Sequence, residues 1–198
     1  MIKRLFDIIF SFLGLVITTP LLGLIALLIK LDSKGPVFYR GKRVGRFGSP
    51  FRIFKFRSMV EKAEELGGPS TASDDPRLTK IGKFLKKYQL DELPQLINVL
   101  KGEMSLVGPR PEVKMYVDMM TDEERKTILS IKPGMTDLAS LWDFHEGEIL
   151  RGSPDPEKTY QEKIRPTKIK LQLEYVKNRS FLLDLKIILK TVLKVFYG

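Results

Sequence analysis

The chain has 198 residues, 43% of them hydrophobic and 29% charged, which is enough for one domain with its own core. The net charge of +10 and a pI near 9.7 favour a polyanionic partner: nucleic acid, anionic lipid headgroups or a phosphorylated substrate. The chain has no cysteine and one histidine, His145, which excludes disulfides, thiolate chemistry and paired-histidine metal sites and leaves any chemistry to carboxylates and cations.

Residues 8–29 form an apolar segment near the N-terminus. None of these residues is charged, and as a helix they would extend about 33 Å, enough to cross a bilayer. No small-x-small site follows, which argues against a cleaved signal peptide. Thr19 and Pro20 stand in the middle, where the proline ring clashes with the carbonyl of Val16 and offers it no N–H. The flanks are basic on both sides: Lys3, Arg4, Lys30, Lys34, Arg40, Lys42 and Arg43.

Two membrane arrangements fit this segment about equally well. The positive-inside rule places both basic flanks in the cytoplasm, as they would be if the segment bends at Thr19–Pro20 and leaves on the face it entered. The alternative is a kinked helix that spans once, because transmembrane helices tolerate proline. We predict re-entry, with the threonine hydroxyls bonding backbone groups that the break leaves open.

The rest of the chain predicts short elements. Val37–Arg40 and Phe51–Arg57 have the pattern of two strands joined by a long loop into a small hairpin. Three short helices and two loops are predicted further on, over Thr79–Tyr88, Leu93–Lys101, Thr121–Ser130, 67–76 and 152–156. A last helix begins after Ser180, a good N-cap, and runs to about Tyr197. Its stripe of lysines suits a helix in the headgroup layer and equally a core-packed helix with a solvated face.

Asp91 and Glu92 are the candidate catalytic carboxylates. They lie at the start of a predicted helix, where the helix dipole favours ionised carboxylates. Neighbouring helical side chains point about 100° apart, so one carboxylate can face a phosphorus atom while the other holds a Mg²⁺ that bridges a diphosphate. On spacing alone, ordinary capping residues explain the pair better.

The candidate substrate-binding residues are cations. Pro109 and Pro111 stiffen the backbone on either side of Arg110, whose planar guanidinium suits bidentate phosphate binding; a rigid surface turn fits equally well. Lys55 and Arg57 alternate along a predicted strand and would present both charges on one face, although a solvent-facing edge strand is the simpler interpretation.

Arg77 is the last candidate, with Asp74 and Asp75 beside it. These residues would support the phosphate-binding groups, and a turn with a capping aspartate explains them equally well.

Nine different short motifs follow one another along the chain: Lys3–Asp7, Gly35–Arg40, Phe51–Met59, Asp75–Thr79, Leu90–Leu96, Asn98–Ser105, Gly108–Pro111, Lys132–Thr136 and Asp184–Ile187. Each is weak alone, but the ordered set is specific. From Arg4 to about Leu189 it resembles the bacterial sugar transferase family, the monotopic polyprenyl-phosphate phosphoglycosyl transferases.

This resemblance implies an α+β, mainly helical, monotopic membrane fold. It would combine an N-terminal re-entrant helix-break-helix over residues 1–34 with a cytosol-facing catalytic domain over residues 35–198. That domain would hold the small β-hairpin and amphipathic interfacial helices, the C-terminal helix among them, at the cytoplasmic face of the bacterial inner membrane. The expected partners are a UDP-sugar, undecaprenyl phosphate and anionic membrane lipids, with a homodimer left open and no nucleic acid.

The resemblance also implies a reaction. Asp91 would attack the β-phosphate of the UDP-sugar, UMP would leave, and a polyprenyl phosphate would collect the phosphosugar from the aspartyl intermediate. Glu92 matches the family's Mg²⁺ ligand, and Arg110 would steady phosphate. Such a transfer would be the first membrane step in the synthesis of an exopolysaccharide, O-antigen, capsule or glycoprotein glycan.

The chain departs from the family pattern in places. Gln89 stands where Ser or Thr is common, Asp137 begins an unusual run, and Gln172 stands where Asp is common. We expect residues 142–166 to form a subgroup-specific loop. A membrane-anchored nucleic-acid-binding protein and a non-catalytic scaffold are the competing interpretations, and the intact carboxylates favour the enzyme.

Overall fold

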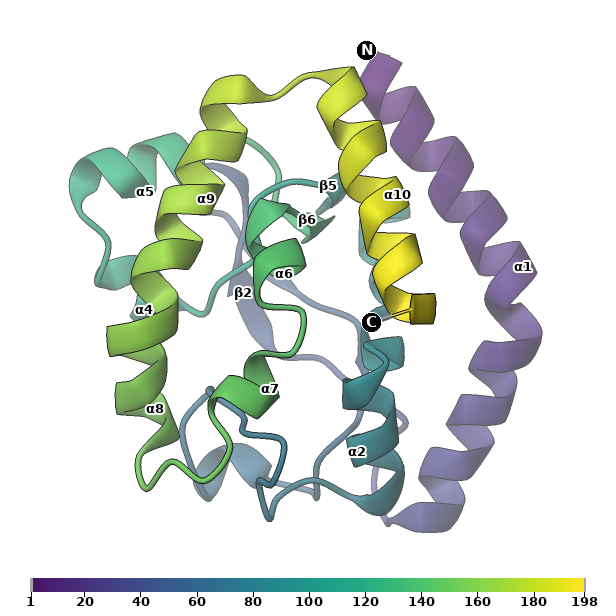
Figure 1. Cartoon of the computed structure of the whole chain (residues 1–198). Helices are drawn as coiled ribbons and strands as arrows, with labels where there is room; N and C mark the ends of the chain where they lie inside the picture. Colours follow the sequence, from purple (N-terminus) through teal and green to yellow (C-terminus); the bar gives the residue numbers. More distant parts are fainter. Residues whose placement is uncertain (1, 198) are drawn as a thin grey trace.

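The computed structural model describes residues 2–197 and is mainly helical, with three small two-stranded sheets. Figure 1 shows three long helices standing around the short strands: α1 (Ile2–Asp32), α9 (Arg165–Asn178) and α10 (Phe181–Tyr197). The shorter helices are α2 (Lys80–Lys87), α3 (Gln95–Lys101), α4 (Lys114–Asp118), α5 (Asp122–Ile128), α6 (Leu138–Trp142), α7 (Glu146–Ile149) and α8 (Pro156–Thr159). The strands are β1 (Phe38–Tyr39), β2 (Lys42–Val44), β3 (Pro50–Arg52), β4 (Lys55–Phe56), β5 (Ser105–Val107) and β6 (Gly134–Thr136).

The N-terminal segment is one unbroken helix, α1, with Pro20 inside it. Figure 1 shows that α1 bows away from the body of the molecule around its middle. The hydroxyls of Thr18 and Thr19 donate to the carbonyls of Gly14 and Leu15, each at 2.7 Å, and not to the Val16 carbonyl that Pro20 leaves without an N–H. The predicted helix-break-helix is therefore corrected to a bend within a continuous helix, because the carbonyls around the proline keep local partners.

Both ends of α1 are attached to the same body. At its start, Arg4 donates to two carbonyls at the end of α3, and the buried Asp7 accepts a hydrogen bond from the backbone N–H of Leu106 at 3.1 Å. At its end, the Asp32 carboxylate accepts from the backbone N–H of Ile81 at 3.1 Å. The charged residues that open and close the apolar segment thus dock the helix along one side of the domain.

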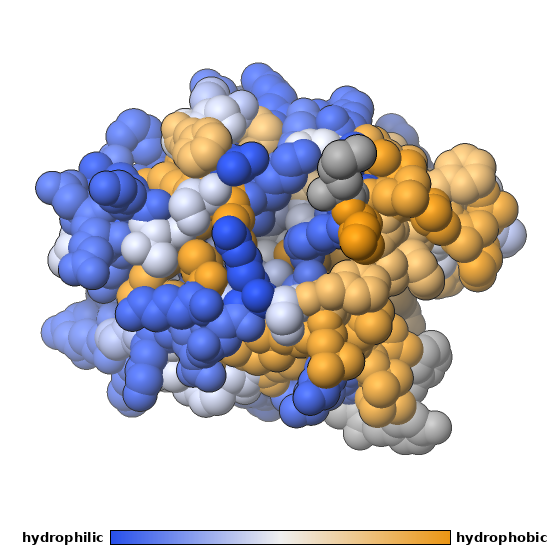
Figure 2. Space-filling model, turned by 90° about the horizontal axis from the view of Figure 1, so that it is seen from above, coloured by the Kyte–Doolittle hydropathy of each residue, from blue (hydrophilic) through white to orange (hydrophobic). Residues whose placement is uncertain are grey.

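An apolar surface follows from this docking. The helix α1 is long and apolar enough to cross a membrane, with a mean hydropathy of 2.5 over its best window, of which 11% is buried. Figure 2 shows apolar side chains gathered on the side that α1 and α10 occupy in Figure 1. The large exposed residues of the two helices include Leu5, Ile9, Phe12, Val16, Ile17, Leu24, Leu27, Leu31, Phe181, Leu182, Leu185, Leu189, Val192 and Leu193. We call these residues the apolar face.

The predicted hairpin is present as two antiparallel pairs, β1 with β4 and β2 with β3. A parallel pair, β5 with β6, was not predicted. It brings Gly108 against Gly134, where the N–H of Gly134 donates to the Pro109 carbonyl at 2.9 Å. A Cβ on Gly134 would lie 2.0 Å from the Gly108 nitrogen, so this crossing requires glycine. The crossing fixes the backbone from which Arg110 projects.

The predicted N-cap of α10 is confirmed, because the Ser180 side chain accepts from the Leu183 N–H. Thr79 caps α2 in the same way, accepting from the Gly82 N–H. The expected loop over residues 142–166 is wrong, because the segment contains α7, α8 and a π-helical turn at Tyr160–Ile164. The helix α9 was also missed.

Candidate active site

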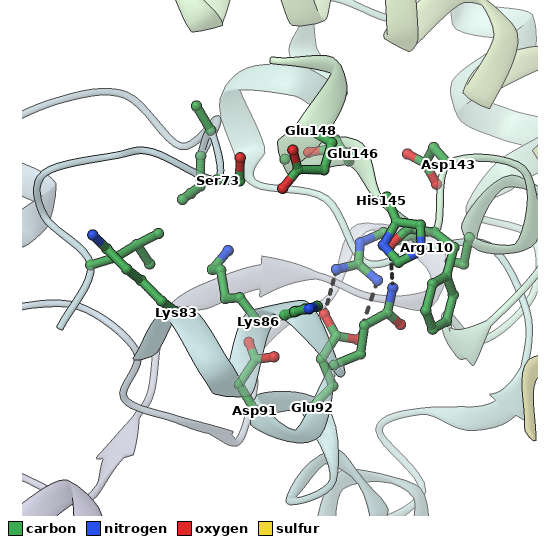
Figure 3. Close-up of a pocket in the computed structure, with 18 of the residues that line it drawn as sticks. Ser73, Lys83, Lys86, Asp91, Glu92, Arg110, Asp143, His145, Glu146 and Glu148 are labelled. Atoms are coloured by element: carbon green, nitrogen blue, oxygen red, sulfur yellow. Dashed lines mark hydrogen bonds and ion pairs between the residues drawn. The ribbon is translucent and has the colours of Figure 1, made fainter. Parts of the chain in front are cut away.

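A cavity of about 290 Å³ lies between α2, the 3₁₀ turn η3 (Leu90–Glu92) and the segment around α7. Figure 3 shows Asp91 and Glu92 on one side of it and Glu146 and Glu148 on the opposite side. The charged residues that line the cavity are Lys83, Lys86, Lys87, Asp91, Glu92, Arg110, Asp143, Glu146, Glu148 and Lys168, with His145 among them. Anions and sugars both bind through such groups, so the cavity suits a charged, hydroxylated substrate.

Asp91 is the buried carboxylate of this cavity, with 4% of its surface exposed. It lies in η3, one turn before α3 and not inside that helix. No ion pair or hydrogen bond to its side chain is present among the residues that the structure describes. Burial raises the pKa of Asp91, and the nearby Lys55 offsets only part of that rise, so burial outweighs the helix-dipole effect expected from the sequence.

Glu92 lies between two cations. Its Oε1 is 2.6 Å from the Lys55 ammonium and 2.5 Å from the Arg110 guanidinium, and its Oε2 is 3.3 Å from the same guanidinium. Burial alone would raise the pKa of Glu92, but attraction from Arg110 and Lys55, with their hydrogen bonds, holds it well below its ordinary value. One carboxylate with two cations leaves excess positive charge beside Asp91. We call Lys55, Glu92 and Arg110 the cationic cluster.

A second cluster has the reverse composition. The ammonium of Lys168, on α9, is 2.9 Å from Asp143 and 2.5 Å from Glu146, and its side chain is 5% exposed. This acidic cluster was missed from the sequence, because its members come from α9 and from a segment expected to be a loop. The sequence signal that was available is the acidic spacing of Asp143, Glu146 and Glu148, and nothing local links it to Lys168.

The lysines of α2 were not among the predicted site residues. Lys83 and Lys86 line the cavity, and Lys86 lies five residues before Asp91. A basic helix turn directly ahead of the candidate nucleophile was the available signal.

Of the predicted substrate-binding cations, Arg110 lines the cavity, whereas Lys55, Arg57 and Arg77 do not. Arg57 donates to the carbonyls of Ser33 and Lys34, which follow the end of α1 and lack helical partners. Arg77 binds the Asp75 carboxylate at 2.8 Å and donates to three carbonyls of residues 63–70. Both guanidinium groups therefore hold loops in place, and the predicted pairing of Lys55 with Arg57 on one face is not formed. The predicted alternation does not extend to Arg57 because β4 ends at Phe56 and the Arg57 guanidinium bonds to the open carbonyls after α1.

The remaining predicted residues meet at one place. Lys55, Asp91, Glu92 and Arg110 are neighbours, and Pro109 and Pro111 are buried on either side of Arg110.

The carboxylates also fit the expected metal. Mg²⁺ prefers oxygen ligands, usually one or two carboxylates with substrate phosphates and water. Asp91 and Glu92 offer such oxygens, because the Asp91 carboxylate bonds to no group in the described part of the chain and Glu92 Oε2 accepts only a long hydrogen bond. The structure shows no group of three or more metal-binding side chains among its described residues, so phosphate and water would complete the set.

A buried carboxylate among cations, next to a long apolar helix, is typical of an enzyme that acts on an anionic substrate at a membrane. The family description of bacterial sugar transferases matches residues 1–198. This chain belongs to the bacterial sugar transferase family.

Relatives of stated function support the assignment. An undecaprenyl-phosphate N-acetylgalactosaminephosphotransferase of Aeromonas hydrophila is 37% identical over 201 residues, covering 100% of this chain and 44% of that protein. A UDP-glucose:undecaprenyl-phosphate glucose-1-phosphate transferase of Escherichia coli is 37% identical, covering 99% of this chain and 40% of its own length. An exopolysaccharide production protein of Rhizobium leguminosarum is 37% identical, covering 96% and 93%. The chain thus spans less than half of the first two relatives and nearly all of the third.

Proposed function

We propose that this protein transfers a sugar 1-phosphate from a UDP-sugar to undecaprenyl phosphate and releases UMP. The observation that carries the proposal is Asp91, a buried carboxylate in the cavity to which no cation of the described residues bonds, beside a cluster with excess positive charge. Such a carboxylate is available as a nucleophile, and the neighbouring cations attract a diphosphate. The names of the relatives give the substrate classes.

The reaction proceeds in two displacements. A carboxylate oxygen of Asp91 bonds to the β-phosphorus as the bond from that phosphorus to the bridging oxygen breaks, and UMP leaves with that oxygen. An oxygen of the prenyl phosphate then displaces Asp91 from the phosphosugar, which restores the carboxylate. Splitting the transfer this way replaces one difficult step with two easier ones.

The cations of the site position and neutralise the phosphates. Phosphoryl transfer depends mainly on such positioning, and Arg110 offers a planar fork that matches two phosphate oxygens. Lys86 lies on the opposite side of Asp91 from Arg110 (Figure 3), so a diphosphate over Asp91 meets cations on both sides. Mg²⁺ held by Glu92, with Asp91 nearby, would supply further neutralisation of phosphate charge when bound.

The test is UMP release by the protein in nanodiscs with undecaprenyl phosphate and a panel of UDP-sugars. We expect release with one or two donors, lost with EDTA and lost in Asp91→Asn. The matched control is Asp118→Asn, which changes an exposed aspartate paired with Lys114 and should keep wild-type release. Release that survives Asp91→Asn, or no release with any donor, would overturn the proposal.

We also propose that α1 is re-entrant and that the domain lies on the cytoplasmic face of the inner membrane. Both ends of α1 bond to one body, which favours two ends on the same side of the bilayer. The chain has no cysteine, so Ile2→Cys and Ser33→Cys each give a single labelling site. In sealed vesicles, a membrane-impermeant thiol reagent should label both from the same side, and labelling from opposite sides would show a single span.

A further inference from the structure

Gln89 adopts a backbone conformation that is unusual for its residue type. Its φ is +53° and its ψ +22°, in the left-handed region, and it connects α2 to the turn that carries Asp91. Two other residues that are not glycine, Phe47 and Lys62, also have positive φ in the described chain, but neither lines the cavity. Such a conformation persists where surrounding contacts hold it, and it is frequent at functional sites.

A side-chain hydrogen bond joins Gln89 to another part of the cavity lining. Its side-chain amide donates to the Phe144 carbonyl at 2.9 Å, joining residues that are 55 positions apart. Between residues 89–92 and 143–148, this is the one hydrogen bond in the part of the chain that the structure describes. The backbone of Gln89 also bonds to the elements on either side of it. Its N–H donates to the Lys86 carbonyl in α2, and its carbonyl accepts from the Glu92 N–H in η3.

The segment that Gln89 holds is itself well anchored. Residues 143–148 include two members of the acidic cluster, both bound to Lys168. The Gly147 carbonyl also accepts from the Ser73 N–H at 2.8 Å. The segment is therefore a fixed wall opposite Asp91, and Gln89 ties the catalytic turn to it.

We propose that Gln89 is a positioning residue that sets the distance between Asp91 and the wall formed by residues 143–148. This inference rests on the proposed function, in which a donor lies between the two. Gln89 acts through the backbone of the turn and through Phe144, while the wall holds the donor and Asp91 attacks it. A misplacement of the nucleophile by about 1 Å lowers the rate about 100-fold, so a single tie of this kind is consequential.

Two substitutions separate positioning from stability. Gln89→Ala removes the amide and keeps a side chain in the left-handed region, whereas Gln89→Gly removes the amide and also the backbone strain. We expect both to lower kcat for UMP release about 10- to 100-fold while the KM for the donor changes less than about threefold. The glycine variant should unfold at the wild-type temperature or above. The proposal would be overturned if the glycine variant kept wild-type kcat and the alanine variant lost kcat only in step with a lower unfolding temperature.

Gln161→Ala is the matched control. The Gln161 amide donates to Glu157 at 3.0 Å outside the cavity lining, so the same chemical deletion there should leave kcat unchanged.

Hydrogen–deuterium exchange tests the tie without catalysis. In the full chain in nanodiscs, backbone amides of the turn over residues 90–93 should exchange about tenfold faster in both Gln89 variants and at the wild-type rate in Gln161→Ala. Unchanged exchange would overturn the proposal even if kcat falls. If the wild type releases no UMP from any donor, the proposed function fails, and exchange still decides whether Gln89 holds the wall to the turn.

Discussion

The two charge clusters of the cavity are opposites. In the cationic cluster the carboxylate of Glu92 lies between Lys55 and Arg110, whereas in the acidic cluster the ammonium of Lys168 lies between Asp143 and Glu146. Lys168 is buried and Glu92 is partly buried, and each is compensated twice by partners of opposite sign. One cluster therefore has net positive charge and the other net negative charge when all groups are ionised.

This difference gives the cavity a direction. A nucleotide sugar has a negatively charged diphosphate at one part and neutral hydroxyl groups at another. Its charge distribution therefore complements a cavity with one positive and one negative cluster. We expect the diphosphate at the cationic cluster, beside Asp91, and hydroxyl groups toward the acidic cluster, where carboxylates accept hydrogen bonds. Four substitutions test this comparison.

Glu92→Gln should have the largest effect. It leaves the partly exposed Lys55 and Arg110 without their carboxylate and removes the candidate metal ligand. We expect kcat/KM for UMP release to fall at least about 10³-fold, equivalent to about 4 kcal/mol. Glu174→Gln, on the exposed side of α9, is the control and should behave as wild type. Near-wild-type activity of Glu92→Gln would show that the cationic cluster does not act in the reaction.

Lys168→Met removes the centre of the acidic cluster. Asp143 and Glu146 then face each other without the ammonium, which should lower the free energy of unfolding by about 3 kcal/mol. Denaturant unfolding in detergent measures the loss, and the exposed Lys170→Met should change it by less than about 0.5 kcal/mol. A loss as small as that of the control would mean that the cluster contributes little to stability.

Arg110→Lys keeps the charge of the cationic cluster and removes the planar fork. A single ammonium cannot bond two phosphate oxygens in the same geometry, so kcat/KM should fall about 10- to 100-fold. The same kinetic assay on Arg179→Lys, an exposed arginine, provides the comparison. If Arg110→Lys retains full activity, charge alone is sufficient at this position.

Asp143→Asn should have the smallest effect, and a pH-dependent one. Burial raises the pKa of Asp143 to about 6, despite Lys168, while the pKa of Glu146 is held at about 2. Because folding raises the pKa of Asp143, its contribution to stability is present at low pH and is lost as the pH rises through 6. The asparagine variant should therefore gain on the order of 1 kcal/mol relative to wild type between pH 4.5 and 7.5. Thermal unfolding at both values measures this, and parallel pH profiles would contradict it.

Much of the site was predictable from its residues. The candidates Lys55, Asp91, Glu92 and Arg110 are neighbours in the structure, although their roles remain proposals. The predicted pairing of Lys55 with Arg57 on one face does not form, because the Arg57 guanidinium donates to the open carbonyls of Ser33 and Lys34, which only the fold brings beside it. The same holds for the tie between Gln89 and Phe144, which depends on the packing of segments 55 residues apart.

Local sequence patterns predicted the apolar helix, the capped start of α10 and the order of motifs that shows the family, because apolar runs, capping residues and motif order are properties of neighbouring residues. Only the folded chain shows that β5 and β6 pair and that Lys168 meets Asp143 and Glu146. These features depend on which distant backbone and side-chain groups satisfy one another in the folded chain, and no local pattern reports that.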